Sequence, residues 1–275
     1  MPYAKKWIQG KDVRRCNVTK YIENFMRFQP LLNELVARDI KIKYRRSVLG
    51  VLWTLLNPLL MMIVLSIVFS NLFKFDVENF PLYLLSGQVV FNYFANATTS
   101  SMGAIIENSS LIKKIYVPKY LFVLSRTASS FINLLASFTA LLFVMVAQRA
   151  ELHYTIFLVI IPILLLVVFS LGVGLILAAL VVRFRDIMHL YSVFITALMY
   201  LTPVIYPINI LPEMIKKIVL LNPITNYLIM FRDVMMNNAL PNSNYIIIGV
   251  AEAIIALAVG LYVFYKSQDE FILNI

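Results

Sequence analysis

The chain has 275 residues, of which 61% are hydrophobic and 14% are charged, and its formal net charge at pH 7 is +10. Soluble domains carry charge on about a quarter of their residues, so this composition excludes an ordinary soluble protein and indicates a polytopic membrane protein. The net charge alone would suggest nucleic-acid binding, but basic loops held on the cytoplasmic side of a membrane explain it better. We expect no cleaved leader, because residues 1–48 are charged and lack the apolar core of a signal peptide.

The first predicted element is a helix at residues 28–47, within the charged segment 1–48. Its apolar residues recur at helical spacing, and its other positions are largely charged. A basic amphipathic helix of this type lies in the cytoplasmic interface and anchors on anionic lipid. The alternative is a soluble helix that packs on another domain. The residues assigned to this interfacial helix are Leu31, Leu35, Arg38, Lys41, Lys43, Arg45 and Arg46.

Six apolar runs lie between residues 49 and 265, each near or above the length of about 20 residues that a helix needs to cross the hydrocarbon core. We predict an all-α polytopic membrane protein with six transmembrane helices and a short cytoplasmic tail at 266–275. In the fourth run, Gly172 and Gly174 permit close packing of helices, which we favour over a contact with substrate. The predicted spans are 49–73, 80–102, 120–147, 154–182, 190–212 and 245–265.

The second run is polar for a membrane span, because it carries Gln88, Asn92 and Asn96. Neighbouring helices should therefore shelter it from lipid. Aromatic faces beside amide groups suit sugar rings, which offer C–H faces and hydroxyl groups together. The alternative for each aromatic residue is helix packing or an interfacial belt. The candidate channel-lining residues of the second and fifth runs are Phe91, Tyr93, Phe94, Tyr200 and Tyr206.

A polar and basic loop, ENSSLIKKIYVPKY at residues 107–120, separates the second and third runs. A basic loop held only by lipid charge would explain its lysines but not the adjacent apolar pair Leu111 and Ile112. Arg126 follows one or two turns into the third run, where we expect its side chain to snorkel to the cytoplasmic interface.

The segment between the fifth and sixth runs, residues 213–240, is not predicted to span the membrane. Its apolar part at 218–231 is too short to cross the membrane, and Pro223 interrupts it, so we predict short re-entrant helices. Glu252 lies inside the sixth run, and an intramembrane carboxylate normally faces a cavity or a partner. A structural pairing with a re-entrant residue such as Arg232 competes here with a role in transport.

Six spans place both termini on one side, and the basic residues decide which. With cytoplasmic termini, 19 of the 24 Lys and Arg residues are inside: 12 in 1–48, 4 in 103–126, 2 at 183–185 and 1 at 266. The remaining 5 are outside. The positive-inside rule therefore predicts that both termini face the cytoplasm.

The sequence contains no catalytic constellation. On the predicted topology His153 and His189 lie on opposite sides of the membrane, so they cannot share a metal ion. No segment matches the phosphate-binding pattern G-x-x-x-x-G-K-[S/T], so we expect the chain to bind no nucleotide through such a loop.

Five segments, in this order, resemble the permease subunits of bacterial ABC exporters that move lipid-linked polysaccharides such as O-antigen, capsule and teichoic acid. The resemblance covers about residues 25–270. The segments are RRSVLGVLWTLLNPLL (45–60), ENSSLIKKIYVPKYLFVLS (107–125), VRFRDIMHL (182–190), LTPVIYP (201–207) and LNPITNYLIMFRDVM (221–235).

The resemblance implies a homodimer of six-span subunits in the bacterial plasma (inner) membrane, paired with two copies of a separate ATPase subunit. ATP and Mg would bind that partner, and this chain would carry no cofactor and no enzymatic activity. The substrate would be a polyprenyl-linked polysaccharide exported from the cytoplasm. An exporter of drugs or small lipids is the alternative within the family. An ion-coupled transporter or a membrane-embedded enzyme is the alternative outside it, although Glu252 is the only midspan acid.

In that family the loop between the second and third spans forms a coupling helix seated in the ATPase, which here corresponds to residues 108–117. Ser109 and Ser110 could cap its start, and Pro118 would end it. Leu111, Ile112 and Ile115 would then offer an apolar patch to the ATPase, and Lys113 and Lys114 would meet its acidic residues. By the same resemblance the re-entrant helices narrow the outer exit of a channel between two permeases, and aromatic residues of the first, second and fifth spans line it. The coupling-helix residues are Asn108, Ser109, Ser110, Leu111, Ile112, Lys113, Lys114, Ile115 and Tyr116.

Overall fold

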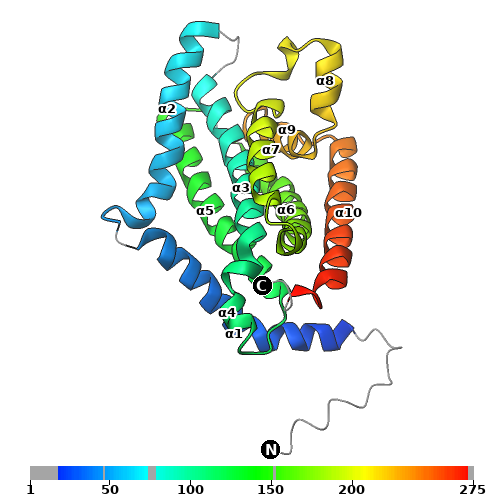
Figure 1. Cartoon of the computed structure of the whole chain (residues 1–275). Coiled ribbons are helices and arrows are strands. Elements are labelled where there is room, and N and C mark those ends of the chain that lie inside the picture. Colours follow the sequence, from blue (N-terminus) through cyan, green and yellow to red (C-terminus); the bar gives the residue numbers. More distant parts are fainter. Residues whose placement is uncertain (1–17, 46, 74–78, 151–152, 272–275) are drawn as a thin grey trace, which may run out of the picture.

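The computed structural model describes residues 18–45, 47–73, 79–150 and 153–271 (Figure 1). These residues form helices and their connections, with no strand among them, which confirms the all-α fold class. The first 17 residues, the predicted interfacial residue Arg46 and the last four residues of the predicted tail lie outside the described part.

The first helix, α1 (Val18–Tyr44), begins ten residues before the predicted start and carries Pro30 inside it. It crosses one end of the helical bundle at a steep angle to the other helices (Figure 1). The 3₁₀ helix η2 (Gly50–Leu52) then leads into α2 (Trp53–Phe73). Gly50 has a φ of +50°, a conformation that glycine adopts without strain, and this lets the chain turn into α2.

The centre of the bundle consists of α3 (Phe80–Glu107), α5 (Tyr120–Ala147) and α6 (Ile160–Arg183), with the one-turn helix α4 (Ser109–Ile112) between α3 and α5. Helix α3 extends five residues beyond its predicted end at 102. The fourth predicted run begins with the 3₁₀ helix η3 (Tyr154–Val159) before it continues as α6. As the polar composition of α3 suggested, its neighbours bury most of its length.

The fifth predicted run, 190–212, is helical only as α7 (Ile187–Leu201), so its predicted end is wrong. Thr202 is extended because it precedes Pro203, and a residue before proline avoids the helical conformation. The chain then passes through the 3₁₀ helix η4 (Ile208–Ile210) to α8 (Glu213–Leu220) and α9 (Pro223–Met235). Helices α8 and α9 are bent by 91° at their junction, the geometry of a broken span or a re-entrant loop.

The last helix, α10 (Ser243–Ser267), packs along α6 through two glycines. A Cβ atom built on Gly260 would lie 2.4 Å from the carbonyl oxygen of Gly172, and one built on Gly172 would lie 2.4 Å from the backbone of Ala256. The predicted packing role of Gly172 is therefore visible as a contact between the two helix backbones.

Three helical segments among the described residues are long and apolar enough to cross a membrane: Tyr120–Ala147, Tyr154–Arg183 and Ser243–Ser267. The bent pair α8 and α9 makes a fourth if it is counted as one span, and α2 and α7 are shorter apolar helices. Length and composition of these helices identify the chain as an integral membrane protein.

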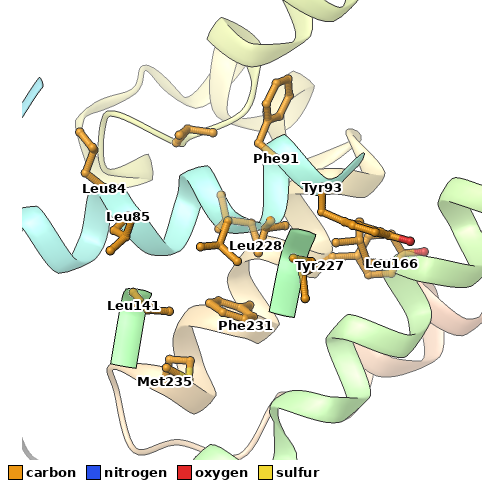
Figure 2. Packing of buried hydrophobic residues seen from close by; sticks show 14 of the residues in the cluster. Leu84, Leu85, Phe91, Tyr93, Leu141, Leu166, Tyr227, Leu228, Phe231 and Met235 are labelled. Atoms are coloured by element: carbon orange, nitrogen blue, oxygen red, sulfur yellow. The ribbon is translucent and has the colours of Figure 1, made fainter. Parts of the chain in front are cut away.

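The main core lies between α3, α5, α6 and α9. Figure 2 shows Leu228 and Phe231 of α9 pointing into the space between α3 and Leu141 of α5. Phe231 meets Phe138 of α5 edge to face, with ring centroids 6.3 Å apart. Because α9 is wedged into this core, the shelter that a re-entrant helix needs is present.

Candidate functional site

The loop between α3 and α5 is held at its base by Asn108, the residue at which α3 ends. Its side-chain amide donates to the carbonyl of Ala104 at 2.8 Å and its side-chain oxygen accepts from Arg38 Nη2 at 2.9 Å. The predicted caps Ser109 and Ser110 lie inside α4, and no side chain caps its start. The predicted helix at 108–117 is therefore a single turn, followed by a non-helical segment up to α5.

Two of the three residues predicted to form an exposed apolar patch face inward. Ile112 is buried and Leu111 is partly buried, and both pack in the cluster that contains Leu35 and Phe122. Only Ile115 is exposed, together with Tyr116, whose side chain is 95% accessible. Residues 113–116, with both lysines exposed, form the outermost part of the loop, which we call the docking tip.

The far end of this loop is fastened to the end of the chain. Lys119 Nζ donates a hydrogen bond to the carbonyl of Gln268 and lies 5.4 Å from the ring centroid of Phe271. Phe271 in turn packs edge to face on Phe264 of α10. Burial lowers the pKa of Lys119 from its ordinary value, while the charge of Asp269 opposes that shift. The docking tip is thus braced at both of its bases.

The apolar face of α1 contacts the protein rather than open surface. Leu35 is buried and Leu31 packs beside it against residues of α3, α4 and α5. The opposite side of α1 carries Lys41, Lys43 and Arg45, all exposed, and burial of part of the Lys43 side chain lowers its pKa. A groove of about 460 Å³ runs along this basic side, lined by Glu34, Arg38, Lys41, Ile42 and Arg45.

The Arg126 side chain lies between acidic residues of α3 and α1. Its guanidinium forms an ion pair with Glu107 at the end of α3, and its Nε lies 3.5 Å from Asp39 Oδ2 of α1. Sequence reasoning missed Asp39, although its position gave a signal. It lies four residues after Leu35 and so shares the apolar face of α1, where an acid needs a partner.

The predicted channel-lining aromatics separate into two groups. Phe91, Tyr93 and Phe94 are buried inside the subunit, at most 3% exposed, so in this structure they pack in the core and present no surface to a channel. Tyr200 at the end of α7 is 67% exposed. The hydroxyl of Tyr206 donates to the carbonyl of Tyr200 at 2.8 Å, which fixes the loop after α7.

Glu252 pairs with a residue of the predicted re-entrant segment, but this residue is Asn226 and not Arg232, the partner that the prediction suggested. Glu252 accepts a hydrogen bond from the side-chain amide of Asn226, at 3.2 Å. Arg232 instead lies on a different side of α9. There it donates to the carbonyls of Pro203 at 2.7 Å and Val204 at 3.1 Å, and its guanidinium lies 3.5 Å from the ring centroid of Tyr83.

The structure therefore has a braced, exposed tip at one end of the bundle and a bent helix pair tied down by a buried arginine at the other (Figure 1). Residues 30–236 match the family described as ABC-2 type transporter. The chain belongs to this family. The match runs from Pro30 in α1 through the end of α9, so it includes both of these features.

Relatives of this ABC-2 transporter chain are named for the export of O-antigen or the transport of polysialic acid. It is 31% identical over 246 residues to the O-antigen export system permease protein RfbA of Klebsiella pneumoniae, covering 88% of this chain and 93% of the relative. It is 28% identical over 256 residues to the RfbA protein of Myxococcus xanthus, covering 92% and 98%. It is 22% identical over 246 residues to the polysialic acid transport protein KpsM of Escherichia coli, covering 87% and 94%. The resemblance inferred from the sequence is confirmed at the level of the family.

Proposed function

We propose that this chain is the membrane-spanning permease subunit of an ATP-driven ABC exporter of a polyprenyl-linked cell-surface polysaccharide, of the O-antigen, teichoic acid or capsule type. Membership of the ABC-2 family supports the transport role, and the relatives named for O-antigen and polysialic acid favour a polysaccharide over drugs or small lipids. The docking tip carries the proposal, because it combines basic, aromatic and aliphatic side chains on an exposed surface with a rigid support.

In this proposal the docking tip seats in a separate ATPase subunit. Lys113 and Lys114 meet acidic residues of that partner, and Ile115 and Tyr116 provide the apolar contact. Two ATPase copies serve a homodimer of this chain, and ATP and Mg bind to the ATPase. This chain is a transport subunit rather than an enzyme, carries no cofactor, and interacts with membrane and lipid-linked glycan but with no nucleic acid.

We further infer the topology from the charges and the helices together. Helices α2, α3, α5, α6, α7 and α10 are the six spans in the plasma membrane, α1 lies at the cytoplasmic interface, and α8 with α9 is re-entrant. Both termini are cytoplasmic, as the positive-inside count favours. The docking tip is then cytoplasmic, and the α8–α9 pair is at the outer end, where Tyr200 and Tyr206 remain the candidate aromatics of the exit.

The decisive experiment is co-purification with the ATPase subunit of the same exporter. Replacing both Ile115 and Tyr116 by alanine should reduce the ATPase recovered with the chain by about tenfold or more, because exposed aromatic anchors carry much of an interface's affinity. Export of surface polysaccharide should fall with it.

The matched control is Tyr262→Ala, which removes the same type of side chain, also exposed, from the side of α10. It should leave the recovered ATPase unchanged. The proposal fails if the wild-type chain purifies without the ATPase, or if the double replacement retains both full binding and full export.

A further inference from the structure

A cluster of charged and polar side chains joins α1 to the base of the docking tip. It comprises Arg38 and Asp39 of α1, Glu107 and Asn108 at the end of α3, and Arg126 of α5, and we call it the α1–α5 joint. Arg38 Nη2 donates both to Asn108 Oδ1 at 2.9 Å and to Asp39 Oδ1 at 3.1 Å. Arg126 bridges Glu107 and Asp39. Three helices are thus connected by two acids and two arginines, whose formal charges cancel.

The joint combines buried and accessible members. The Asp39 side chain is 5% exposed and that of Arg126 is 19% exposed, whereas Glu107 is 58% exposed. A buried charge requires a partner, so Asp39 and Arg126 hold α1 and α5 at a defined separation. Glu107 contributes the accessible end of the bridge.

The central ion pair is not fully closed in this structure. Arg126 Nε and Asp39 Oδ2 are 3.5 Å apart, and neither atom has a hydrogen-bond partner among the described residues. The buried Arg38 Nε is also unpartnered there. Buried polar atoms are normally hydrogen-bonded, so three such atoms in one small cluster call for an explanation. A shift of α1 toward α5 by a few tenths of an ångström would bring Asp39 and Arg126 into hydrogen-bond distance.

The same helices share an apolar core beneath the joint. Leu35 of α1, Ile105 of α3, Ile112 of α4 and Phe122 of α5 belong to one buried cluster. A displacement of the docking tip therefore reaches α1 by two routes, the shared core and the polar joint. The core resists relative movement, whereas the 3.5 Å separation of Arg126 Nε and Asp39 Oδ2 leaves room for the joint to close.

We propose that Asp39 and Arg126 are positioning residues that transmit movement of the docking tip to α1, and so set how much polysaccharide is exported per ATP hydrolysed. This inference rests on the proposed function, because it needs an ATPase that moves the tip. Neither residue touches nucleotide or glycan. When the ATPase displaces the tip, Glu107 and Asn108 move with it, and the bridge through Arg126 closes or opens against Asp39.

The test uses the complete exporter, reconstituted with its ATPase subunit, and measures exported polysaccharide and ATP hydrolysis in the same sample. Asp39→Asn removes the charge but keeps the shape. It should lower the ratio of export to hydrolysis by about tenfold, with the KM for ATP changed less than about twofold. A merely structural role would lower both rates together, in proportion to the amount of folded complex.

Three further variants test whether Asp39 and Arg126 act as a pair. Arg126→Gln should lower the ratio of export to ATP hydrolysis as Asp39→Asn does. The double variant should have a ratio no lower than that of the more impaired single variant, because the effects of replacing two residues in contact are not additive. Asp39→Glu keeps the charge and should restore most of the ratio. Arg149→Gln, an exposed arginine at the end of α5 away from the joint, is the control and should change nothing.

Glu107→Gln keeps the test decisive if the buried replacements fail to accumulate. Its side chain is mostly exposed, so the variant should fold, and release of Arg126 should lower the ratio about threefold. An unchanged ratio in both Glu107→Gln and Asp39→Asn overturns the proposed role of the α1–α5 joint, but not the proposed function. A wild-type chain that neither binds the ATPase nor exports overturns the proposed function instead, so the two failures are distinguishable.

Discussion

At the scale of single residues, Arg232 explains how the bent segment stays in place. Besides the carbonyls of Pro203 and Val204, it donates to the carbonyl of Tyr83 and to Ser86 Oγ, both on α3. One buried guanidinium therefore ties α9 to α3 and to the loop that follows α7. The carbonyls of Pro203 and Val204 lie in irregular backbone, where no helical N–H is available to them.

Replacing Arg232 by glutamine should destabilise the protein strongly. Several buried carbonyls would lose their donor, and each unsatisfied group costs about 1–3 kcal/mol. We expect the Tm in detergent to fall by about 5 °C or more, measured by the loss of the monodisperse peak after heating. Arg149→Gln, which removes an exposed arginine, should leave Tm unchanged. An equal Tm for Arg232→Gln and wild type would show that Arg232 does not hold the segment.

The failed pairing of Arg232 with Glu252 shows what a single sequence leaves undetermined at this scale. The prediction placed Glu252 against the re-entrant segment, and it does contact α9, but through Asn226. Asn226 and Arg232 are six residues apart, so on a helix they point about 120° away from each other. Sequence gives this angle but not the rotation of α9 about its axis, which depends on how its apolar residues fill the core.

At the scale of helices, the lengths of the apolar runs in the sequence predicted where the helices lie, and proline and glycine residues marked where they break. The predicted helix limits were wrong where the chain leaves the helical conformation inside an apolar or polar stretch that composition alone treats as continuous. Pro203 ends α7 eleven residues before the predicted limit, because apolar composition continues after the helix has stopped. The coupling helix is shorter than predicted at its far end, because α4 begins at Ser109 but stops at Ile112, five residues before the predicted limit at 117. Buried partners such as Asp39 and Arg126, 87 positions apart, lay beyond any local pattern.

The contact between α6 and α10 makes a prediction at the helix scale. Gly172→Ala would place a Cβ atom 2.4 Å from the backbone of Ala256, and a backbone cannot move aside as a flexible side chain can. The two helices must separate, so we expect a loss of about 1–3 kcal/mol in stability, seen as a lower Tm in detergent.

The control for this contact lies on α10, the other helix of the pair. Ala258→Leu adds a larger side chain to α10 but at an exposed position, so it should leave Tm within about 2 °C of wild type. If Gly172→Ala melts at the wild-type temperature, the close approach of α6 and α10 is not required for stability.

At the scale of the whole molecule, the two ends of the bundle have different tasks. The α1 end carries the docking tip, the α1–α5 joint and the end of α10, and the other end carries α8 and its connections (Figure 1). Charge counting assigns the first end to the cytoplasm. Movement must then travel along α3 and α5, which run from the joint into the main core.

The sequence alone was sufficient to predict the class of protein, the order of the helices and the family, because these depend on composition and on the order of the motifs. It also singled out the loop at 107–120, since exposed lysines beside apolar residues are unusual. The sequence did not determine which residues of that loop face outward. Ile112, which was expected to be exposed, is buried. Burial depends on the distant residues Leu35 and Phe122, which only the folded chain brings together.

The central claim is that the docking tip contacts the ATPase subunit, and site-specific photo-crosslinking tests it most directly. A photoreactive phenylalanine analogue in place of Tyr116, in cells that make the whole exporter, should give a crosslinked product containing the ATPase. The same analogue in place of Tyr154, an exposed tyrosine in η3 after the end of α5 that is distant from the docking tip, should give none. A crosslink to the ATPase from Tyr154 but not from Tyr116 would contradict both the proposed docking and the proposed orientation.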